Sequence, residues 1–351
     1  MTTKAPVPGE KPNLYGWNRD ELQAFLERYD IPPFHAGQVY RWLYAHHLFD
    51  VEGWTDLALP LRSRIAAEAT VDPGRSMERV SADDGTVKFL VRLPGGGNVE
   101  CVRMLQSERT TLCISSQVGC ALDCDFCLTG KMGFVRNLTA GEIVGQVSLM
   151  VRDAGPEAGT YNIVFMGMGE PLHNFKAVMA AFRLLIDPQG FALSRRRITV
   201  STAGLVPAIE RLAGEPLRPR LAVSLNATTD EVRNRLMPIN RKYGIARLVQ
   251  ACRSYADRTG DGFTFEYVLL DGINDSPQDL ERLAALLRGG PAKLNLIPFN
   301  PVPGRLAYRA PERERVVAFR DGLLRLRVPA SIRWSRGAEA RAACGQLALP
   351  V

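Results

Sequence analysis

The sequence predicts a mixed α/β fold in which parallel strands alternate with helices and curl into a barrel or partial barrel. From Thr111 onward, short apolar runs that read as strands alternate with segments of helical periodicity. Six such strand-and-helix units follow one another, and their connections favour parallel neighbours. A chain of 351 residues is long enough for one large α/β domain and a smaller appendage.

A small helical unit precedes the barrel. Apolar residues recur at helical spacing in Arg19–Tyr29 and in Ala36–His46, with Pro32-Pro33 between the two segments. A third short helix is predicted at Leu61–Glu68. We therefore expect an N-terminal helical accessory domain over residues 1–83.

A hairpin is expected next, over residues 84–110. The turn Asp83-Asp84-Gly85 leads into a strand at Val87–Leu93, and a glycine-rich turn at Pro94–Gly97 separates it from a second strand at Val99–Leu105. The hairpin would stand as an extension before the barrel core.

The barrel core is expected over residues 111–299. Its first helix begins at a capping box, Thr139-Ala-Gly-Glu142, and runs to about Asp153. A C-terminal segment, residues 300–351, would contain a proline-rich loop, a basic helix at Pro311–Arg327 and a strand at Ser331–Trp334. The expected strands of the core are Thr111–Val118, Tyr161–Met166, Ile198–Thr202, Leu221–Leu225, Phe263–Leu270 and Lys293–Pro298.

Composition limits the class of protein. The chain carries a net charge of +7, which is compatible either with a polyanionic partner such as a nucleic acid or with a mildly basic surface. Candidate phosphate contacts are Arg195–Arg197, Arg241-Lys242 and the arginines of Pro311–Arg327. No apolar run is long enough for a membrane span and no signal sequence is visible, so we expect a cytoplasmic protein.

Three of the seven cysteines are spaced for metal ligation rather than for disulfides. Cys120, Cys124 and Cys127 form a C-x3-C-x2-C motif directly after the first barrel strand. Three thiolates can hold a 4Fe–4S cluster and leave one iron without a protein ligand. Structural zinc normally takes four ligands, and no fourth Cys or His stands nearby. A thiol cluster without metal is the alternative.

Other distinctive residues follow the carboxyl ends of later strands. Gly167-Met-Gly-Glu170 follows the second strand, Ser201-Thr-Ala-Gly204 ends the third, Ser224-Leu-Asn226 ends the fourth and Asn300 follows the sixth. In parallel α/β folds this rim is where ligands bind. The sequence thus predicts one site on one rim.

The cysteine motif, with Phe126 before its last cysteine, resembles the radical S-adenosylmethionine (SAM) superfamily. Further motifs resemble the RlmN family of adenine-C2 methyltransferases, which act on 23S rRNA and in some members on tRNA. The resemblance implies a radical SAM partial (β/α)6 barrel with a helical accessory domain and a C-terminal extension. The motifs are Cys113-Ile-Ser-Ser-Gln-Val-Gly-Cys120, Phe165-Met-Gly-Met-Gly-Glu-Pro171, Leu236-Met-Pro-Ile-Asn240 and Ala343-Cys-Gly-Gln-Leu347.

The resemblance also implies roles for individual residues. Cys344 would accept a methyl group, and Glu100 would be the base that removes the C2 proton of adenine. Cys113 would release the methylated RNA from the protein by forming a disulfide with Cys344. The implied cofactors are a 4Fe–4S cluster and two molecules of SAM per turnover. The implied partners are RNA and an electron donor such as flavodoxin, and we expect a monomer. Residues implied in SAM binding are Gly169, Glu170, Ser201, Ser224, Leu225, Asn226 and Asn300.

Alternatives remain for these residues. Without the resemblance, Cys344 would be taken for a tail thiol, Cys113 for a buried strand cysteine and Glu100 for a solvated carboxylate. Cys101 and Cys252 belong to no motif and are interpreted as packing residues. The rival functions are methylation of adenine C8, as in the Cfr group, and a noncatalytic iron–sulfur protein that binds RNA.

Overall fold

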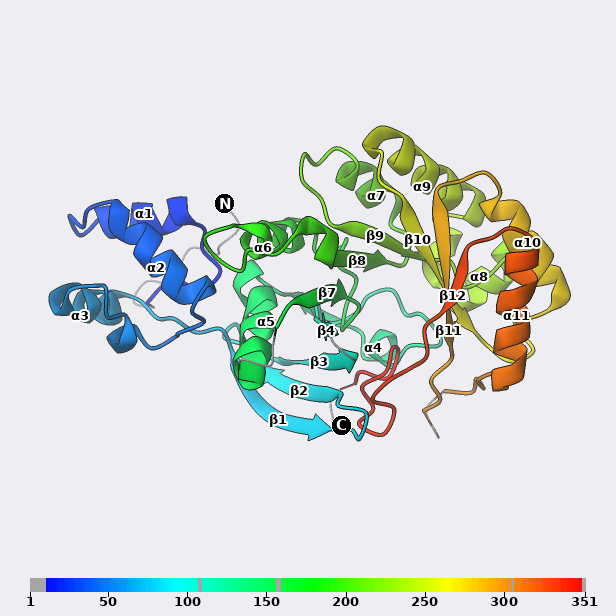
Figure 1. Ribbon diagram of the computed structural model, residues 1–351, viewed down its shortest axis with the longest axis horizontal. Helices are drawn as coiled ribbons and strands as arrows, with labels where there is room; N and C mark the ends of the chain where they lie inside the picture. The colour runs from blue at the N-terminus through cyan, green and yellow to red at the C-terminus, as the bar shows by residue number, and fades with distance from the viewer. Residues whose placement is uncertain (1–10, 107–108, 156–158, 303, 305, 349–351) are drawn as a thin grey trace.

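A single ten-stranded sheet forms the centre of the protein. The computed structural model describes residues 11–106, 109–155, 159–302, 304 and 306–348. The strands are ordered β1-β2-β3-β4-β7-β8-β9-β10-β11-β12, so that they follow chain order with β5 and β6 left out (Figure 1). The order is linear, which makes the sheet an open, partial barrel as predicted.

The parallel part of the sheet carries the predicted strand-and-helix units. Each pair of neighbouring strands in this part, from β4 to β12, is parallel. The last strand, predicted at Ser331–Trp334, is β12 and pairs with β11. The strands are β4 (Arg109–Cys113), β7 (Tyr161–Phe165), β8 (Ile198–Thr202), β9 (Arg220–Ser224), β10 (Phe263–Leu269), β11 (Ala292–Pro298) and β12 (Ala330–Ile332).

Amphipathic helices cover this sheet. Helix α5 begins at the predicted capping box, in which Thr139 Oγ1 accepts from the N–H of Glu142 and the Glu142 carboxylate accepts from the N–H of Thr139. Among the described residues, no helix has both the length and the apolarity of a membrane span. The helices are α5 (Ala140–Ala154), α6 (Phe175–Ile186), α7 (Val206–Leu212), α8 (Asp230–Leu236), α9 (Ile245–Thr259), α10 (Pro277–Leu287) and α11 (Arg313–Arg325).

The N-terminal helical unit packs against α5. It contains α1 (Arg19–Glu27), α2 (Phe34–Tyr44) and α3 (Leu59–Glu68), close to the three predicted helices. Figure 1 shows these helices at one end of the molecule, beside α5. Tyr15 Oη lies 2.5 Å from Ser148 Oγ on α5, and a Cβ at Gly141 would lie 2.3 Å from the carbonyl oxygen of Tyr15. Because Gly141 has no side chain, the backbone of the N-terminal unit can lie directly against helix α5.

The segment before the hairpin differs from the prediction. Residues 75–81, which we assigned to the helical unit, form strand β1 (Arg75–Ser81), antiparallel to β2 (Val87–Arg92). Strand β1 is mostly exposed and lacks the alternation of apolar and polar residues by which strands are predicted. With β3 (Asn98–Gln106), the hairpin becomes a three-stranded antiparallel extension joined to β4.

The predicted strand Thr111–Val118 is two strands. β4 ends at Cys113, and β5 (Gln117–Gly119) pairs instead with β6 (Phe134–Asn137) in a separate two-stranded sheet. Between them the backbone of Ser115 exchanges two hydrogen bonds with the side chain of Gln146 on α5, at 2.8 and 3.0 Å. A side chain thus takes the place of a strand partner, which lets the chain leave the sheet here.

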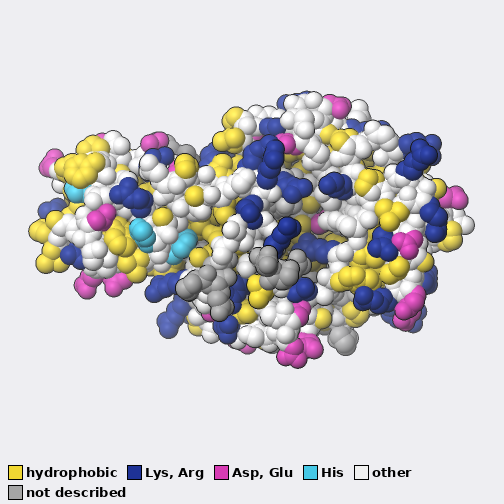
Figure 2. Space-filling model, viewed as in Figure 1, with side chains coloured by type: hydrophobic (Ala, Val, Ile, Leu, Met, Phe, Trp, Pro, Cys, Tyr) yellow, Lys and Arg dark blue, Asp and Glu magenta, His cyan; other side chains and the backbone are white. Residues whose placement is uncertain are grey.

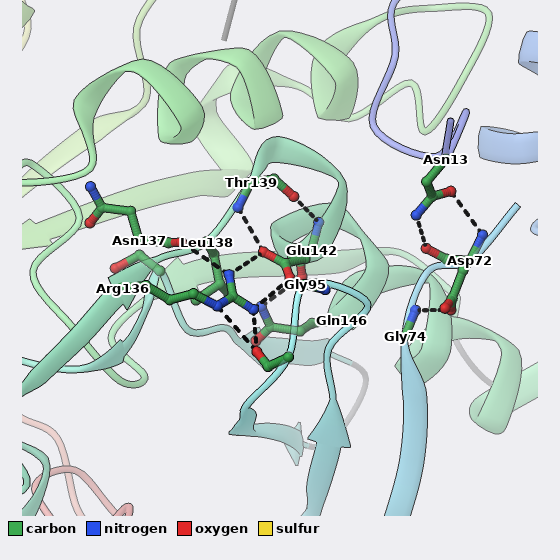
Figure 3. A network of polar contacts seen from close by, with 12 residues as sticks. Asn13, Asp72, Gly74, Gly95, Arg136, Asn137, Leu138, Thr139, Glu142 and Gln146 are labelled. Atoms are coloured by element: carbon green, nitrogen blue, oxygen red, sulfur yellow. Dashed lines mark hydrogen bonds and ion pairs between the residues drawn. The ribbon is translucent and has the colours of Figure 1, made fainter. Parts of the chain in front are cut away.

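An ion pair fixes the small β5–β6 sheet next to the hairpin. Arg136 Nη2 lies 2.7 Å from Glu142 Oε1, and the same carboxylate oxygen accepts from the N–H of Gly95 in the hairpin turn at 3.0 Å (Figure 3). Glu142 also closes the capping box. One buried carboxylate thereby joins β6, the hairpin turn and α5. The same figure shows Asn13 bonded to Asp72 in the N-terminal unit.

The C-terminal segment returns from the last strand to the first ones. In Figure 1 it leaves β12 and runs toward β2, β3 and α4 (Leu128–Lys131). The N–H of Gly337 donates to Asp84 Oδ2 at 2.9 Å, and the N–H of Leu128 donates to the carbonyl of Gly345 at 2.9 Å. This return brings residues near 344 to the loop that carries the three cysteines.

Candidate active site

The three motif cysteines gather in the loop between β5 and α4. Burial raises the pKa of each thiol, that of Cys120 to about 12, and the neighbouring thiols raise the pKa of Cys124 further. Three half-buried thiols that disfavour each other's ionisation become stable as thiolates when a metal cation neutralises their charge. The loop therefore has the donor set of a metal centre.

The arrangement fits a cluster better than a single ion. Within the described part of the chain, no group of three His, Cys, Asp or Glu side chains converges on one ion position. In a cubane, each cysteine thiolate binds a different iron, so the sulfurs need not converge on one point. Three thiolates in one loop are the donor set of a 4Fe–4S cluster, whose fourth iron would have no protein ligand.

The loop after β7 lies against the cysteine loop. Gly169 has φ +96°, and a Cβ there would lie 2.5 Å from the Gln117 side chain, so glycine is required. The next residue, Glu170, is buried, which raises its pKa to about 7. Its carboxylate accepts from the N–H of Leu172 at 3.0 Å and from that of Ala203 at 2.8 Å. Glu170 thus joins the rims of β7 and β8.

The rims of β8 to β10 bring the remaining predicted SAM residues together. Ser201 Oγ donates to Glu266 Oε2 on β10 at 2.9 Å. Asn226, with φ +55°, accepts from the N–H of Val268 through Oδ1 at 2.8 Å. Ser224 and Leu225 lie directly before Asn226, so the carboxyl ends of three neighbouring strands present these residues on one side of the sheet.

Arg233 stabilises this rim through hydrogen bonds from helix α8 (Asp230–Leu236). It is completely buried on α8 and donates to the carbonyls of Ala203, Ser224 and Leu225 at 2.8–2.9 Å. Its Nη1 also donates to Asn240 Oδ1 at 2.8 Å. Asn240 is the last residue of one family motif, and the structure gives it a supporting position. Sequence reasoning missed Arg233, although an arginine on a short helix beside that motif was a possible signal.

Cys113 and Cys344 line one narrow cavity. Cys113 is buried at the end of β4, while Cys344 is half-buried in the returning segment. Asn300 Nδ2 donates to the carbonyl of Cys344 at 2.9 Å, which places this predicted SAM residue beside the predicted methyl acceptor. The other lining residues include Met104, Met166, Arg333 and Leu347.

Glu100 lies beside the same returning segment. It is buried on β3, where Lys88 on β2 forms an ion pair with it. Burial raises the pKa of Glu100, while Lys88 and the backbone N–H of Ala348 lower it. The alternative of a solvated strand carboxylate is thus wrong, and Glu100 and the segment of Cys344 are close together.

The structure adds two residues to this region that sequence reasoning missed. Arg333 follows β12, and its Nη1 lies 3.1 Å from Met166 Sδ in the thiol cavity. Glu266 is a buried carboxylate in the middle of β10. A glutamate inside the apolar run Phe263–Leu270 was a signal that could have found it, because buried carboxylates are rare without a function.

Other candidates lie elsewhere. Cys101 and Cys252 are fully buried, in agreement with packing roles.

Arg195–Arg197 directly precede β8, and Arg195 forms a bidentate pair with Asp261, which precedes β10. This places them at the amino ends of the strands, on the rim opposite the site. Their interpretation as candidate contacts to RNA phosphates stays a prediction, and any such contact would lie on the rim opposite the site.

Comparisons with known proteins agree with this geometry. Residues 114–287 match the family model of the radical SAM superfamily, and residues 12–71 match that of the ribosomal RNA large subunit methyltransferase N-terminal domain. The dual-specificity RNA methyltransferase RlmN of Anaeromyxobacter sp. (strain Fw109-5) is 47% identical, over 98% of this chain and 92% of its own. That of Dinoroseobacter shibae is 46% identical, over 97% and 90%.

A solved structure is also similar over nearly its whole length. The crystal structure of a radical SAM methyltransferase from Sphaerobacter thermophilus matches with a TM-score of 0.92 and 46% sequence identity. The match covers 96% of this chain and 99% of that one. The similarity therefore includes the N-terminal helical unit and the returning C-terminal segment as well as the barrel.

Proposed function

The chain belongs to the RlmN family of radical SAM RNA methyltransferases, and on that premise we propose that it methylates carbon C2 of an adenine in 23S rRNA, and in tRNA as well. Its cofactors are a 4Fe–4S cluster and SAM. The observation that carries the proposal is the cavity shared by Cys113 and Cys344, with Glu100 next to the same segment.

The residues that hold the cofactors lie on one rim. Cys120, Cys124 and Cys127 would hold the cluster, which supplies the electron that cleaves bound SAM to a carbon radical. The rim residues from Gly169 to Asn300 described above would bind SAM. Since Glu170 and Asn226 are already bonded to backbone groups, their contribution is to shape the rim and present its peptide groups.

The protein's own groups would then transfer the methyl carbon. Cys344 would carry a methyl group whose carbon, once activated, adds to the electron-poor C2 of adenine. Glu100 would accept the C2 proton, for which its buried position beside Lys88 is suitable. Cys113 would attack Cys344 Sγ, which releases methylated RNA and leaves a disulfide between the two cysteines.

Surface charge supports an RNA partner. Lys and Arg side chains are spread across the face seen in Figure 2, including its middle, while Asp and Glu lie mostly toward its edges. The net charge of +7 also favours binding to the phosphates of RNA.

We propose in addition an electron donor such as flavodoxin, a monomeric state and a cytoplasmic location. The proposed units are the accessory domain (1–83), the hairpin extension (84–110), the barrel core (111–299) and the C-terminal segment (300–351).

Mapping the modified base tests the proposal. RNA from cells with and without this gene is separated into 23S rRNA and tRNA, digested to nucleosides and analysed by mass spectrometry. We expect 2-methyladenosine to disappear without the gene and to return with the wild-type gene, but not with a Cys344→Ala gene. If 8-methyladenosine changed instead, the C2 assignment would be wrong, and if no methyladenosine changed, the whole proposal would fail.

A further inference from the structure

A guanidinium with few protein partners lies in the thiol cavity. The N–H of Arg333 donates to the carbonyl of Leu296 at 2.8 Å, which continues the pairing of β12 with β11 and fixes the backbone. Its side chain bonds to Met166 Sδ at 3.1 Å, and a thioether is a weak acceptor. Among the described residues, no carboxylate lies within ion-pair distance of Arg333.

The charged and titratable groups that face this guanidinium come from three directions. Cys113 approaches from the end of β4, Cys344 from the returning segment and Glu266 from β10, and all three raise the pKa of Arg333. Cys101 of β3 also lies near Cys113, because its chain neighbour Val102 pairs with Cys113. Arg333 is thus a cation whose neighbours are two thiols and one carboxylate.

Cys113 needs such a cation if it is to act as a nucleophile. The thiolate, not the thiol, attacks sulfur, and burial raises the pKa of Cys113 to about 12. Cys344 and Glu266 raise that pKa as well, whereas Arg333 lowers it. Without Arg333, Cys113 would ionise still less readily.

We infer that Arg333 is a positioning residue that stabilises the thiolate of Cys113 as it attacks Cys344. The inference rests on the proposed function and assigns a role to a residue outside the family motifs. In this disulfide-forming step, a bond forms between Cys113 Sγ and Cys344 Sγ. The bond between Cys344 Sγ and the methylene carbon that joins it to adenine breaks. The electron pair passes to that carbon, which takes up a proton and becomes the methyl group of the product.

Thiol–disulfide exchange isolates this attack from the radical chemistry. The cluster-loaded protein is treated with oxidised glutathione so that Cys344 carries glutathione as a mixed disulfide. Cys113 then attacks Cys344 Sγ, forms the internal disulfide and expels the glutathione thiolate, while the proton of Cys113 passes to water. Peptide mass spectrometry measures how fast the Cys113–Cys344 disulfide appears at several pH values.

Four variants then separate charge from structure. Arg333→Gln should slow the exchange about tenfold at each pH, which corresponds to about one unit of pKa. Arg333→Lys, which keeps the charge, should restore most of the rate. Arg336→Gln is the matched control, since Arg336 lines the same cavity but donates to the carbonyl of Leu105. Glu266→Gln should accelerate the exchange, because it removes a neighbouring negative charge.

The outcomes separate the two proposals. An unchanged rate in Arg333→Gln, or a slower rate in Glu266→Gln, would overturn the role of Arg333. Glu266→Gln changes the charge around Cys113 independently of Arg333→Gln, so the test holds even if Arg333→Gln does not fold. If the disulfide fails to form in the wild-type protein as well, the resolving step of the proposed function is wrong instead.

Discussion

Lys88 on β2 and Glu100 on β3 form an ion pair across the hairpin, with Nζ 2.8 Å from Oε1. The side chains are 15% and 3% exposed, so both charges are largely removed from water. Burial raises the pKa of Glu100 and Lys88 lowers it, so the lysine favours the carboxylate form that can accept a proton. The hairpin is therefore more than an extension of the sheet, since it holds the proposed base and the group that favours its charged form.

Replacing the lysine should shift the pH dependence of catalysis. In Lys88→Met, the pKa of Glu100 rises further, so the acidic limb of the pH–rate profile should move to higher pH by about one unit or more. The unfolding free energy at pH 8 should fall by about 3 kcal/mol, and by less at acidic pH, where Glu100 is neutral. Single-turnover rates and chemical denaturation at several pH values provide the measurements.

Lys293→Met, at an exposed position of β11, is the matched control and should change neither quantity. If Lys88→Met retained the wild-type pH–rate profile, then Glu100 would not be the group that accepts the proton.

The cysteine motif should determine iron content. Anaerobic reconstitution should give about four irons and four sulfides per chain in the wild-type protein, and Cys124→Ala should lose most of both. Cys252→Ala, at a buried cysteine of α9, is the control and should keep them. The measurement is metal and sulfide analysis with absorption spectra. Stoichiometric zinc without sulfide would contradict the assignment.

Arg233 should be essential for the rim and for stability. Its removal takes one donor from each of three carbonyls and leaves a hole in the buried rim, so Arg233→Met should lower the unfolding free energy by about 3 kcal/mol. Arg235→Met changes an exposed arginine of the same helix and should have little effect. Chemical denaturation measures both. Equal stability of the two variants would show that water satisfies these carbonyls.

Most of the fold follows from local patterns in the sequence. The capping box at Thr139, the apolar strand runs and the turn at Pro94–Gly97 each depend on residues close together in the chain, and the structure confirms them. Strand β1 could not be predicted because its stability comes from pairing with β2 rather than from its own exposed side chains. The break after Cys113 depends on Gln146, a distant residue that bonds to Ser115.

The site was predictable only as far as its motifs reach. The motifs identified Cys120, Cys344 and Glu170 as candidates, and the topology brings their segments to one rim. The partners Lys88 and Arg333 were not found, because each acts on a residue that is distant in sequence or in a different strand. Their roles follow from burial and charge, which appear only after the strands are placed side by side.

Methyl transfer to the protein should be specific for one thiol. Protein produced in cells with a working cluster should carry one additional methyl group on the peptide that contains Cys344, because this thiol is half-buried in the cavity near the cluster loop. Cys101 and Cys252 are fully buried and should remain unmodified. Peptide mass spectrometry gives the position, and a methyl group on either buried cysteine would show that the assigned carrier is wrong.

The two thiols of the cavity should fail in different ways when each is replaced. Cys113→Ala should still allow methylation of Cys344 and addition of its carbon to adenine, because neither step needs the second thiol. The reaction should then stop, since no group can attack Cys344 Sγ, and a covalent protein–RNA species should accumulate. It is detected as a nucleic-acid-containing band that survives denaturation and disappears after nuclease treatment.

Cys344→Ala is the matched variant and should give no such band, because the atom that joins protein to RNA is missing. The double variant should behave like Cys344→Ala, since the carrier acts before the resolving thiol. Normal turnover by Cys113→Ala would reduce Cys113 to a packing residue of β4, despite its place in the same cavity. If Cys113→Ala bound RNA as tightly as the wild type yet gave no adduct, then carbon transfer itself would depend on Cys113, and the order of steps proposed here would be wrong.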